Sequence, residues 1–104
     1  RNGGRAGSRQ VIPRDWIEAS WRPRTQSIFH DDHYGYGWFL TEMAGQRVSY
    51  AWGYGGQMIY VAPSLGLTVI MTSTENHPSA RSGHRDRLHG LMRSIVAAMK
   101  AEQA

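Results

Sequence analysis

The chain has 104 residues, enough for one domain or part of one, and no apolar run approaches the roughly 20 residues that span a membrane. It has no cysteine, which excludes disulfides, thiolate metal sites and a cysteine nucleophile. Its net charge of +4 comes from arginines that are scattered without forming a basic stripe, so we expect neither a nucleic-acid nor a membrane partner.

The first third of the chain predicts loops around one short helix. Residues 1–10 are rich in glycine, arginine and serine, as loops are. A helix is predicted over 12–20, because Pro13 suits the first helical position and Asp15 suits the first turn. Residues 22–33 are polar and predict a surface loop.

Residues 34–74 predict a series of antiparallel strands. The aromatic-rich residues 34–40 are expected to be extended, and a turn at Gly45-Gln46 leads to a strand over 47–53. A further strand is predicted over 57–62. It ends at a Pro-x-x-Gly sequence that is typical of a hairpin turn.

The end of the chain predicts a strand followed by a long helix. The strand over 67–72 is nearly all apolar, so we expect it to be central and covered on both faces. A polar loop is expected over 73–84 and a helix over 85–102. The apolar stripe of this helix comprises Leu88, Leu91, Met92, Ile95, Val96 and Met99. The predicted fold class is α+β, an antiparallel sheet meander packed by a long C-terminal helix.

A strand-like run is interrupted by three glycines within four residues, Gly53, Gly55 and Gly56. Glycine weakens a strand interior and occurs there mainly where another backbone or a ligand approaches closely. The segment from Gly53 to Gln57 is therefore the first candidate for the wall of a site. The flanking aromatic residues Trp52 and Tyr54 are expected at the cleft.

Three motifs follow one another along the chain: Gln10-Val11-Ile12-Pro13 with Asp15-Trp16, then Tyr34-Gly35-Tyr36-Gly37-Trp38, then Trp52-Gly53-Tyr54-Gly55-Gly56-Gln57 ahead of the hairpin. In this order they resemble the C-terminal end of the serine β-lactamase and penicillin-binding protein superfamily. They are most similar to its class C-like branch of esterases, D-aminopeptidases and 6-aminohexanoate-dimer hydrolases. The resemblance covers nearly all of this chain but only the last part of such a protein. Residues 1–104 are therefore expected to be a single C-terminal segment of a larger hydrolase domain with a partial β-lactamase/transpeptidase-like fold.

The resemblance implies that the glycine-rich segment serves acyl transfer. Tyr54-Gly55-Gly56 falls on the third motif of the family, on the edge strand along which the acyl chain of the substrate lies. The backbone N–H of Gln57 then maps onto one of two oxyanion donors, whose loss typically raises the barrier by about 3 kcal/mol. Trp52, Gly55 and Gly56 are implied substrate-binding residues. The implied reaction hydrolyses a small amide or ester through an acyl-enzyme, without a metal or cofactor.

The chain departs from the family in two ways. Tyr54 replaces a cation with a neutral phenol, which favours an esterase, amidase or peptidase over a β-lactamase. Its hydroxyl can still hydrogen-bond a substrate or a catalytic hydroxyl, so the resemblance implies a catalytic role for Tyr54 beside the Gln57 N–H. The nucleophile motif Ser-x-x-Lys is absent, because Ala97 stands three residues before the only lysine, Lys100. We therefore expect this segment to be inactive alone. It would need the N-terminal remainder of the same domain, in a bacterial protein of the periplasm or cytoplasm. The alternative is a non-catalytic binding or self-association module.

The histidines are a weaker candidate, for a metal site. His30-Asp31-Asp32-His33 holds four possible ligands, but consecutive loop residues rarely converge on one ion. We expect these histidines to face solvent without binding a metal, with His33 at best on the rim of the substrate entrance. The same expectation covers the histidines around the last helix, His77, His84 and His89.

Hydroxyl and aromatic side chains complete the candidates. Ser49, Ser73 and Thr74 have no Gly-x-Ser-x-Gly elbow and no carboxylate placed to orient a base, so we expect ordinary strand and loop hydroxyls. Trp38 and Tyr60 could serve either the cleft or the core.

Overall fold

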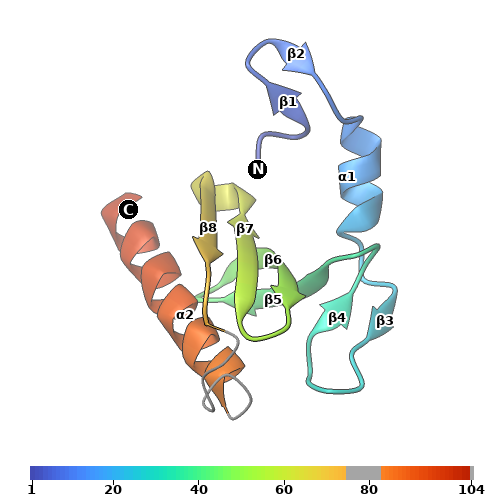
Figure 1. The fold of residues 1–104 in the computed structure, drawn as a ribbon. Coiled ribbons are helices and arrows are strands. Elements are labelled where there is room, and N and C mark those ends of the chain that lie inside the picture. Colours follow the sequence, from blue (N-terminus) through green and yellow to red (C-terminus); the bar gives the residue numbers. More distant parts are fainter. Residues whose placement is uncertain (75–82, 104) are drawn as a thin grey trace.

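The computed structural model describes residues 1–74 and 83–103 and shows an antiparallel sheet with a long helix packed against it (Figure 1). The predicted α+β class is confirmed. The elements in chain order are β1 (Arg5–Ala6), β2 (Arg9–Gln10), α1 (Arg14–Ser20), β3 (Thr25–Gln26), β4 (His33–Tyr34), β5 (Phe39–Met43), β6 (Gln46–Gly53), β7 (Gln57–Ala62), the 3-10 turn η1 (Pro63–Leu65), β8 (Leu67–Met71) and α2 (His84–Gln103).

The main sheet is a meander in which each strand pairs with the next one along the chain. Its strand order is β3-β4-β5-β6-β7-β8, and every pair is antiparallel. The turn between β5 and β6 consists of Ala44 and Gly45, both with positive φ (49° and 77°), as a two-residue hairpin turn requires. The turn predicted at Gly45-Gln46 was therefore one residue late, because Gln46 already pairs with Met43.

The first 40 residues contain more strand than was predicted. Residues 1–33 were expected to hold only loops and a helix, but they include the β1–β2 hairpin and the β3–β4 hairpin, which extends the main sheet. The prediction of one continuous extended segment over 34–40 was wrong. The chain turns between β4 and β5, where the Gly35 N–H donates to the Trp38 carbonyl at 2.8 Å and Gly37 has a φ of 81°.

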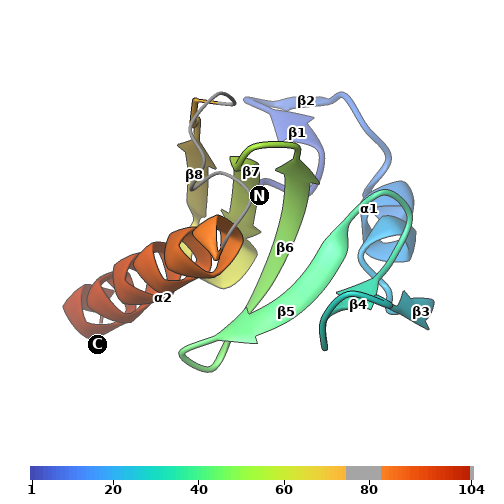
Figure 2. The ribbon, with the colours of Figure 1, turned by 60° about the horizontal axis from the view of Figure 1, so that its bottom comes forward.

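The hydrophobic core lies between α2 and one face of the sheet (Figure 2). Alternate residues of β6 and β7 point to this face, so Tyr50, Met58 and Tyr60 are fully buried against Met92 and Val96 of α2. The undecided Tyr60 thus belongs to the core. Trp38 lies outside it and packs edge-on against Trp21, with ring centres 6.0 Å apart.

The predicted C-terminal helix is confirmed as α2, but its buried stripe is narrower than the apolar pattern indicated. Met92 and Val96 are buried, whereas Leu91 is 53% exposed, so its predicted place in the core was wrong. Leu91 lies about 100° around the helix from Met92, beyond the part that the sheet covers. His89 fills a buried position on the same stripe.

Strand β8 is an edge strand, so the prediction that it is central and covered on both faces was wrong. It pairs with β7 alone in the part of the chain that is described. Leu67, Val69 and Met71 pack toward the core, while Ile70 on the opposite face is 67% exposed. Ile59 of β7 is exposed on that opposite face too.

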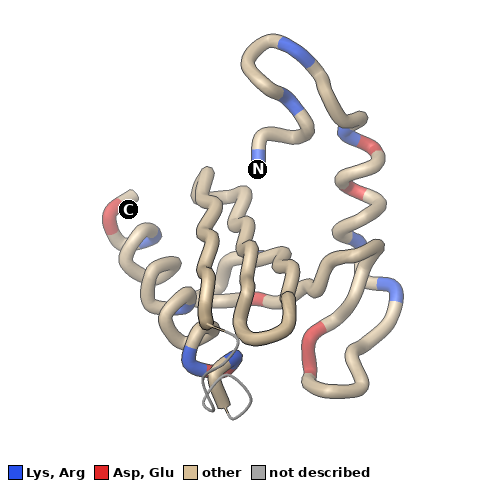
Figure 3. Tube along the Cα trace, viewed as in Figure 1, with Lys and Arg blue, Asp and Glu red and all other residues tan. Residues whose placement is uncertain are grey.

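The N-terminal arm, β1, β2 and α1, lies on the side of the molecule away from α2 (Figures 1 and 2). Trp16 of α1 stacks on Tyr36, with ring centres 5.8 Å apart, yet Trp16 remains exposed. Basic residues are spread over this arm and α2 and are not gathered on one element (Figure 3).

Candidate functional site

The glycine-rich segment forms the tip of the β6–β7 hairpin. The Gly56 N–H donates to the Gly53 carbonyl at 3.2 Å, and Gly53 pairs with Gln57 across the hairpin. Gly55 and Gly56 have φ values of 84° and 93°, which side-chain-bearing residues rarely adopt. The interrupted strand of the sequence is therefore a strand, a tight turn and a second strand.

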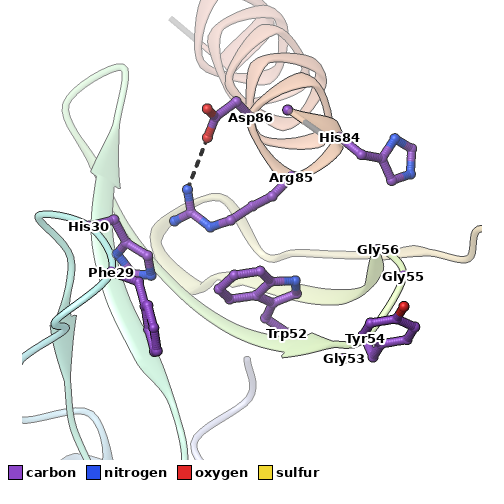
Figure 4. A pocket seen from close by; sticks show the side chains of 11 residues that line it. Phe29, His30, Trp52, Gly53, Tyr54, Gly55, Gly56, His84, Arg85 and Asp86 are labelled. Atoms are coloured by element: carbon purple, nitrogen blue, oxygen red, sulfur yellow. Dashed lines mark hydrogen bonds and ion pairs between the residues drawn. The ribbon is translucent and has the colours of Figure 1, made fainter. Parts of the chain in front are cut away.

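This hairpin tip faces the first turn of α2 across an open pocket of about 540 Å³ (Figure 4). Four of the five predicted site residues line it, namely Trp52, Tyr54, Gly55 and Gly56. Its other lining residues are Phe29, His30, Gly53, Gly83, His84, Arg85 and Asp86. The pocket thus joins a glycine wall and aromatic side chains to the start of a helix that lies far away in the sequence.

The fifth predicted residue, Gln57, does not line this pocket. It is the first residue of β7, and its side chain turns to Ser73. The predicted edge strand is only partly an edge, because β5 pairs with β6 as far as Tyr50. In the described chain, Ala51 to Gly53 extend beyond this pairing, and Trp52 and Gly53 line the pocket.

The side of the pocket opposite the hairpin tip is built on Arg85. Its Nη2 donates to Asp32 Oδ2 at 3.0 Å and to the Tyr50 hydroxyl at 2.7 Å, and Tyr50 donates its proton to the same Asp32 oxygen at 2.5 Å. The guanidinium carbon lies 5.2 Å from the ring centre of Trp52, within cation–π range. The network joins the loop before β4, strand β6 and helix α2.

The protonation states in this network follow from burial and contact. Burial alone would raise the pKa of Asp32, but hydrogen bonds from Tyr50 and Thr41 and the nearby His30 and Arg85 hold it below its ordinary value. Burial and the hydrogen bond to Asp32 raise the pKa of the Tyr50 hydroxyl. Asp32 and Arg85 are therefore charged at neutral pH, while Tyr50 is a neutral donor.

A buried pair, Tyr60 and His89, packs against the ring of Tyr50. The Tyr60 hydroxyl lies 2.7 Å from His89 Nδ1. Burial raises the pKa of Tyr60 to about 12, and burial with the nearby Arg85 lowers the pKa of His89 to about 4. Asp32 Oδ2, an acceptor, lies 3.9 Å from His89 Nε2, which favours the neutral tautomer that carries its proton on Nε2 and accepts the Tyr60 proton at Nδ1.

The histidines differ from their prediction. His30 and His84 line the pocket and His89 is buried, so the expectation that they all face solvent was wrong for these three. His33 in β4 is exposed, as expected, and does not line the pocket. Among residues 1–74 and 83–103, no group of three or more His, Cys, Asp or Glu could hold a metal ion. His77 and most of the predicted loop over 73–84 lie outside the described residues.

Sequence reasoning missed Asp32 and Arg85 as site residues. Asp32 was considered only as a metal ligand within His30-Asp31-Asp32-His33, and Arg85 only as the start of a helix. The two lie 53 residues apart, so no local spacing could join them. Ser73 was classed as an ordinary hydroxyl, although its Oγ lies 3.0 Å from His84 Nε2.

Comparisons of the chain with protein-family models, curated proteins and solved structures found no match. Neither described helix is both long and apolar enough to cross a membrane.

Proposed function

We propose that this chain is the C-terminal part of a serine hydrolase of the β-lactamase/transpeptidase-like superfamily, which hydrolyses an amide or ester through an acyl-enzyme. The observation that carries the proposal is the pocket itself. The motif residues Trp52, Tyr54, Gly55 and Gly56 come together on one wall of a hollow large enough for a small acyl substrate. The resemblance rests on sequence order alone, whereas the pocket is an independent feature of the fold.

In this proposal the glycines allow the substrate to approach the backbone closely, and the N–H of Gln57 is one of the two oxyanion donors. Beyond Tyr50, the edge of β6 next to the pocket is not paired with β5, which leaves main-chain groups of Ala51 to Gly53 for an extended acyl chain. Arg85 is engaged by Asp32, Tyr50 and Asp86, so it organises the site and does not replace the missing family cation.

The nucleophile would come from the N-terminal remainder of the domain, because the chain has no Ser-x-x-Lys. The sheet supports a missing partner. Strand β8 has no charge, proline or bulge to protect its outer edge, and Ile59 and Ile70 are exposed on the face opposite α2. We therefore propose that the remainder of the domain covers this edge and face.

The same edge and face favour a second candidate, a non-catalytic module that associates through β8. Fluorophosphonate labelling of the native gene product, followed by intact mass and peptide mapping, separates the two. The hydrolase proposal predicts an adduct on a serine followed three residues later by lysine, in a chain longer than 104 residues. A native product of this length without an adduct would instead favour the binding module.

A further inference from the structure

A serine and a histidine meet beside the glycine-rich turn, where His84 also lines the pocket. Ser73 lies two residues after β8, and His84 is the first residue of α2. Ser73 Oγ donates to the Gly56 carbonyl at 3.0 Å, and His84 Nε2 lies 3.0 Å from the same Oγ. A hydroxyl has one proton, and here the Gly56 carbonyl accepts it. The proton in the second contact must therefore come from His84 Nε2.

Gln57 holds Ser73 from the other side. Its Nε2 donates to the Ser73 carbonyl at 2.7 Å, and the Ser73 N–H donates to its Oε1 at 3.2 Å. Both ends of one side-chain amide are thus engaged by the backbone of one residue. Ser73 is bound through its hydroxyl to Gly56 and through its backbone to Gln57, which are consecutive residues.

Ser73 and His84, with the hydrogen bond between them and those of Ser73 to Gly56 and Gln57, are here called the clamp. The clamp leaves no room for a side chain at position 56. A Cβ added to Gly56 would lie 2.6 Å from His84 Cδ2 and 2.9 Å from Ser73 Oγ. The close packing and the hydrogen bonds therefore fix the same point of the turn.

We propose that Ser73 and His84 are positioning residues that aim the backbone N–H of Gln57. The Gly56 carbonyl and the Gln57 N–H belong to one peptide group, which is planar and trans, so they point in opposite directions. A hydrogen bond that fixes the carbonyl on Ser73 therefore fixes the N–H as well. The inference rests on the proposed function, in which this N–H is an oxyanion donor.

The protons argue against Ser73 as a nucleophile. An activated serine donates its proton to a histidine that acts as a base. Here the serine donates to a carbonyl and accepts from the histidine, which is the reverse arrangement.

The test uses the full-length native gene product and two independent readouts. One is the rate of fluorophosphonate acylation, and the other is the ¹⁵N–¹H chemical shift of the Gln57 backbone amide. Ser73→Ala and His84→Ala are expected to slow acylation about tenfold, less than the loss of a whole oxyanion donor, and to move the Gln57 amide signal. Ser73→Thr and His84→Gln keep a hydroxyl and an N–H donor and should restore both. The control is Ser64→Ala, which also removes a hydrogen-bonding serine hydroxyl, because Ser64 Oγ donates to the Gln46 side chain beyond the far end of β7 from Gln57.

Three results would overturn the inference. Acylation at the normal rate in Ser73→Ala and His84→Ala would show that the clamp does not aim the donor. A fluorophosphonate adduct on Ser73 itself would make it a nucleophile. If no serine is labelled, the proposed function fails, and the clamp is then judged by the amide signal alone. An unmoved Gln57 signal in Ser73→Ala would overturn it, and a moved signal restored in Ser73→Thr would support it.

Discussion

At the scale of single residues, Gly56 carries the strictest constraint in the site. Its φ of 93° disfavours any side chain, and His84 and Ser73 fill the space that a Cβ would need. Gly37 has a similar φ of 81°, yet in the described part of the chain no atom beyond its own sequence neighbours lies within 4 Å of its Cβ position. The two positions therefore separate backbone strain from crowding.

We expect Gly56→Ala to lower the free energy of unfolding by about 1–3 kcal/mol more than Gly37→Ala does, because only the first variant adds a steric clash to the strained φ. Urea unfolding of the two variants beside the wild type measures the difference. Equal losses would mean that His84 and Ser73 move aside without cost, and that the turn is not held by them.

We expect the burial of His89 to make the stability of the chain depend on pH. Burial and the nearby Arg85 lower its pKa from 6.5 to about 4, so between these values the unfolded chain binds a proton that the folded chain does not. Stability should therefore fall as the pH falls through this window, by up to about 3 kcal/mol. His30, whose pKa is also lowered, adds a loss of the same sign.

Urea unfolding at a series of pH values between 4 and 8 tests this expectation, with a His89→Gln variant that cannot titrate. The free energy of unfolding should depend less steeply on pH in His89→Gln than in the wild type. The control His33→Gln should keep the wild-type dependence, because His33 is exposed. Identical slopes in all three proteins would contradict the burial of a neutral His89.

At the scale of elements, the Asp32–Arg85 pair ties the loop before β4 to the start of α2. Arg85 also binds Asp86, but the Asp86 side chain is 81% exposed, whereas that of Asp32 is largely buried. The same arginine thus pairs with one buried and one exposed carboxylate, so the contributions of the two ion pairs can be compared directly.

Asp32→Asn should destabilise the chain by about 3 kcal/mol, because it leaves the largely buried guanidinium without its main counter-charge. Asp86→Asn should change stability by less than about 0.5 kcal/mol, because solvent screens the exposed pair. Thermal unfolding of both variants measures how much more Asp32→Asn destabilises the chain than Asp86→Asn does. Similar small effects would show that the loop and α2 are held by packing and not by this ion pair.

The elements that sequence reasoning predicted well are those with a local pattern. The apolar period over 85–102 located α2 to within one residue at each end, and the Pro-x-x-Gly sequence located the turn at η1, where Gly66 has a left-handed φ of 60°. The site needed more, since Asp32, Tyr50 and Arg85 meet only after the sheet has formed. No single-residue pattern shows such a pairing.

Two errors have specific physical causes. Strand β8 is apolar on both faces, which normally indicates a central strand, but within residues 1–74 and 83–103 it pairs with β7 alone. Leu91 was predicted to be buried because it continues the apolar stripe of α2, but it is exposed. His89 is buried instead, because the Tyr60 hydroxyl supplies a hydrogen-bond partner that the helical period of the sequence does not indicate.

At the scale of the whole molecule, the exposed β8 edge and apolar face make a prediction about assembly. If the remainder of a hydrolase domain covers them, Ile70→Lys should destabilise the full-length product by about 2 kcal/mol or more, because it buries a charge. In the isolated chain the same change should cost little and should reduce self-association, since Ile70 is 67% exposed.

Unfolding and sedimentation of both forms test this prediction, with Leu91→Lys on α2 as the control for a charge added at an exposed apolar position. A full-length product that tolerates Ile70→Lys as easily as Leu91→Lys would contradict a covered face. It would favour instead the module that associates through β8.

A structure of the full-length product with a fluorophosphonate bound to its reactive serine would show directly whether this segment holds the acyl group. We expect the phosphonyl group in the pocket between Trp52 and the Gly55–Gly56 turn, with its oxygen about 3 Å from the Gln57 backbone nitrogen. An adduct on another face of the domain, or one in the pocket with its oxygen directed away from Gln57, would contradict the proposed role of this segment.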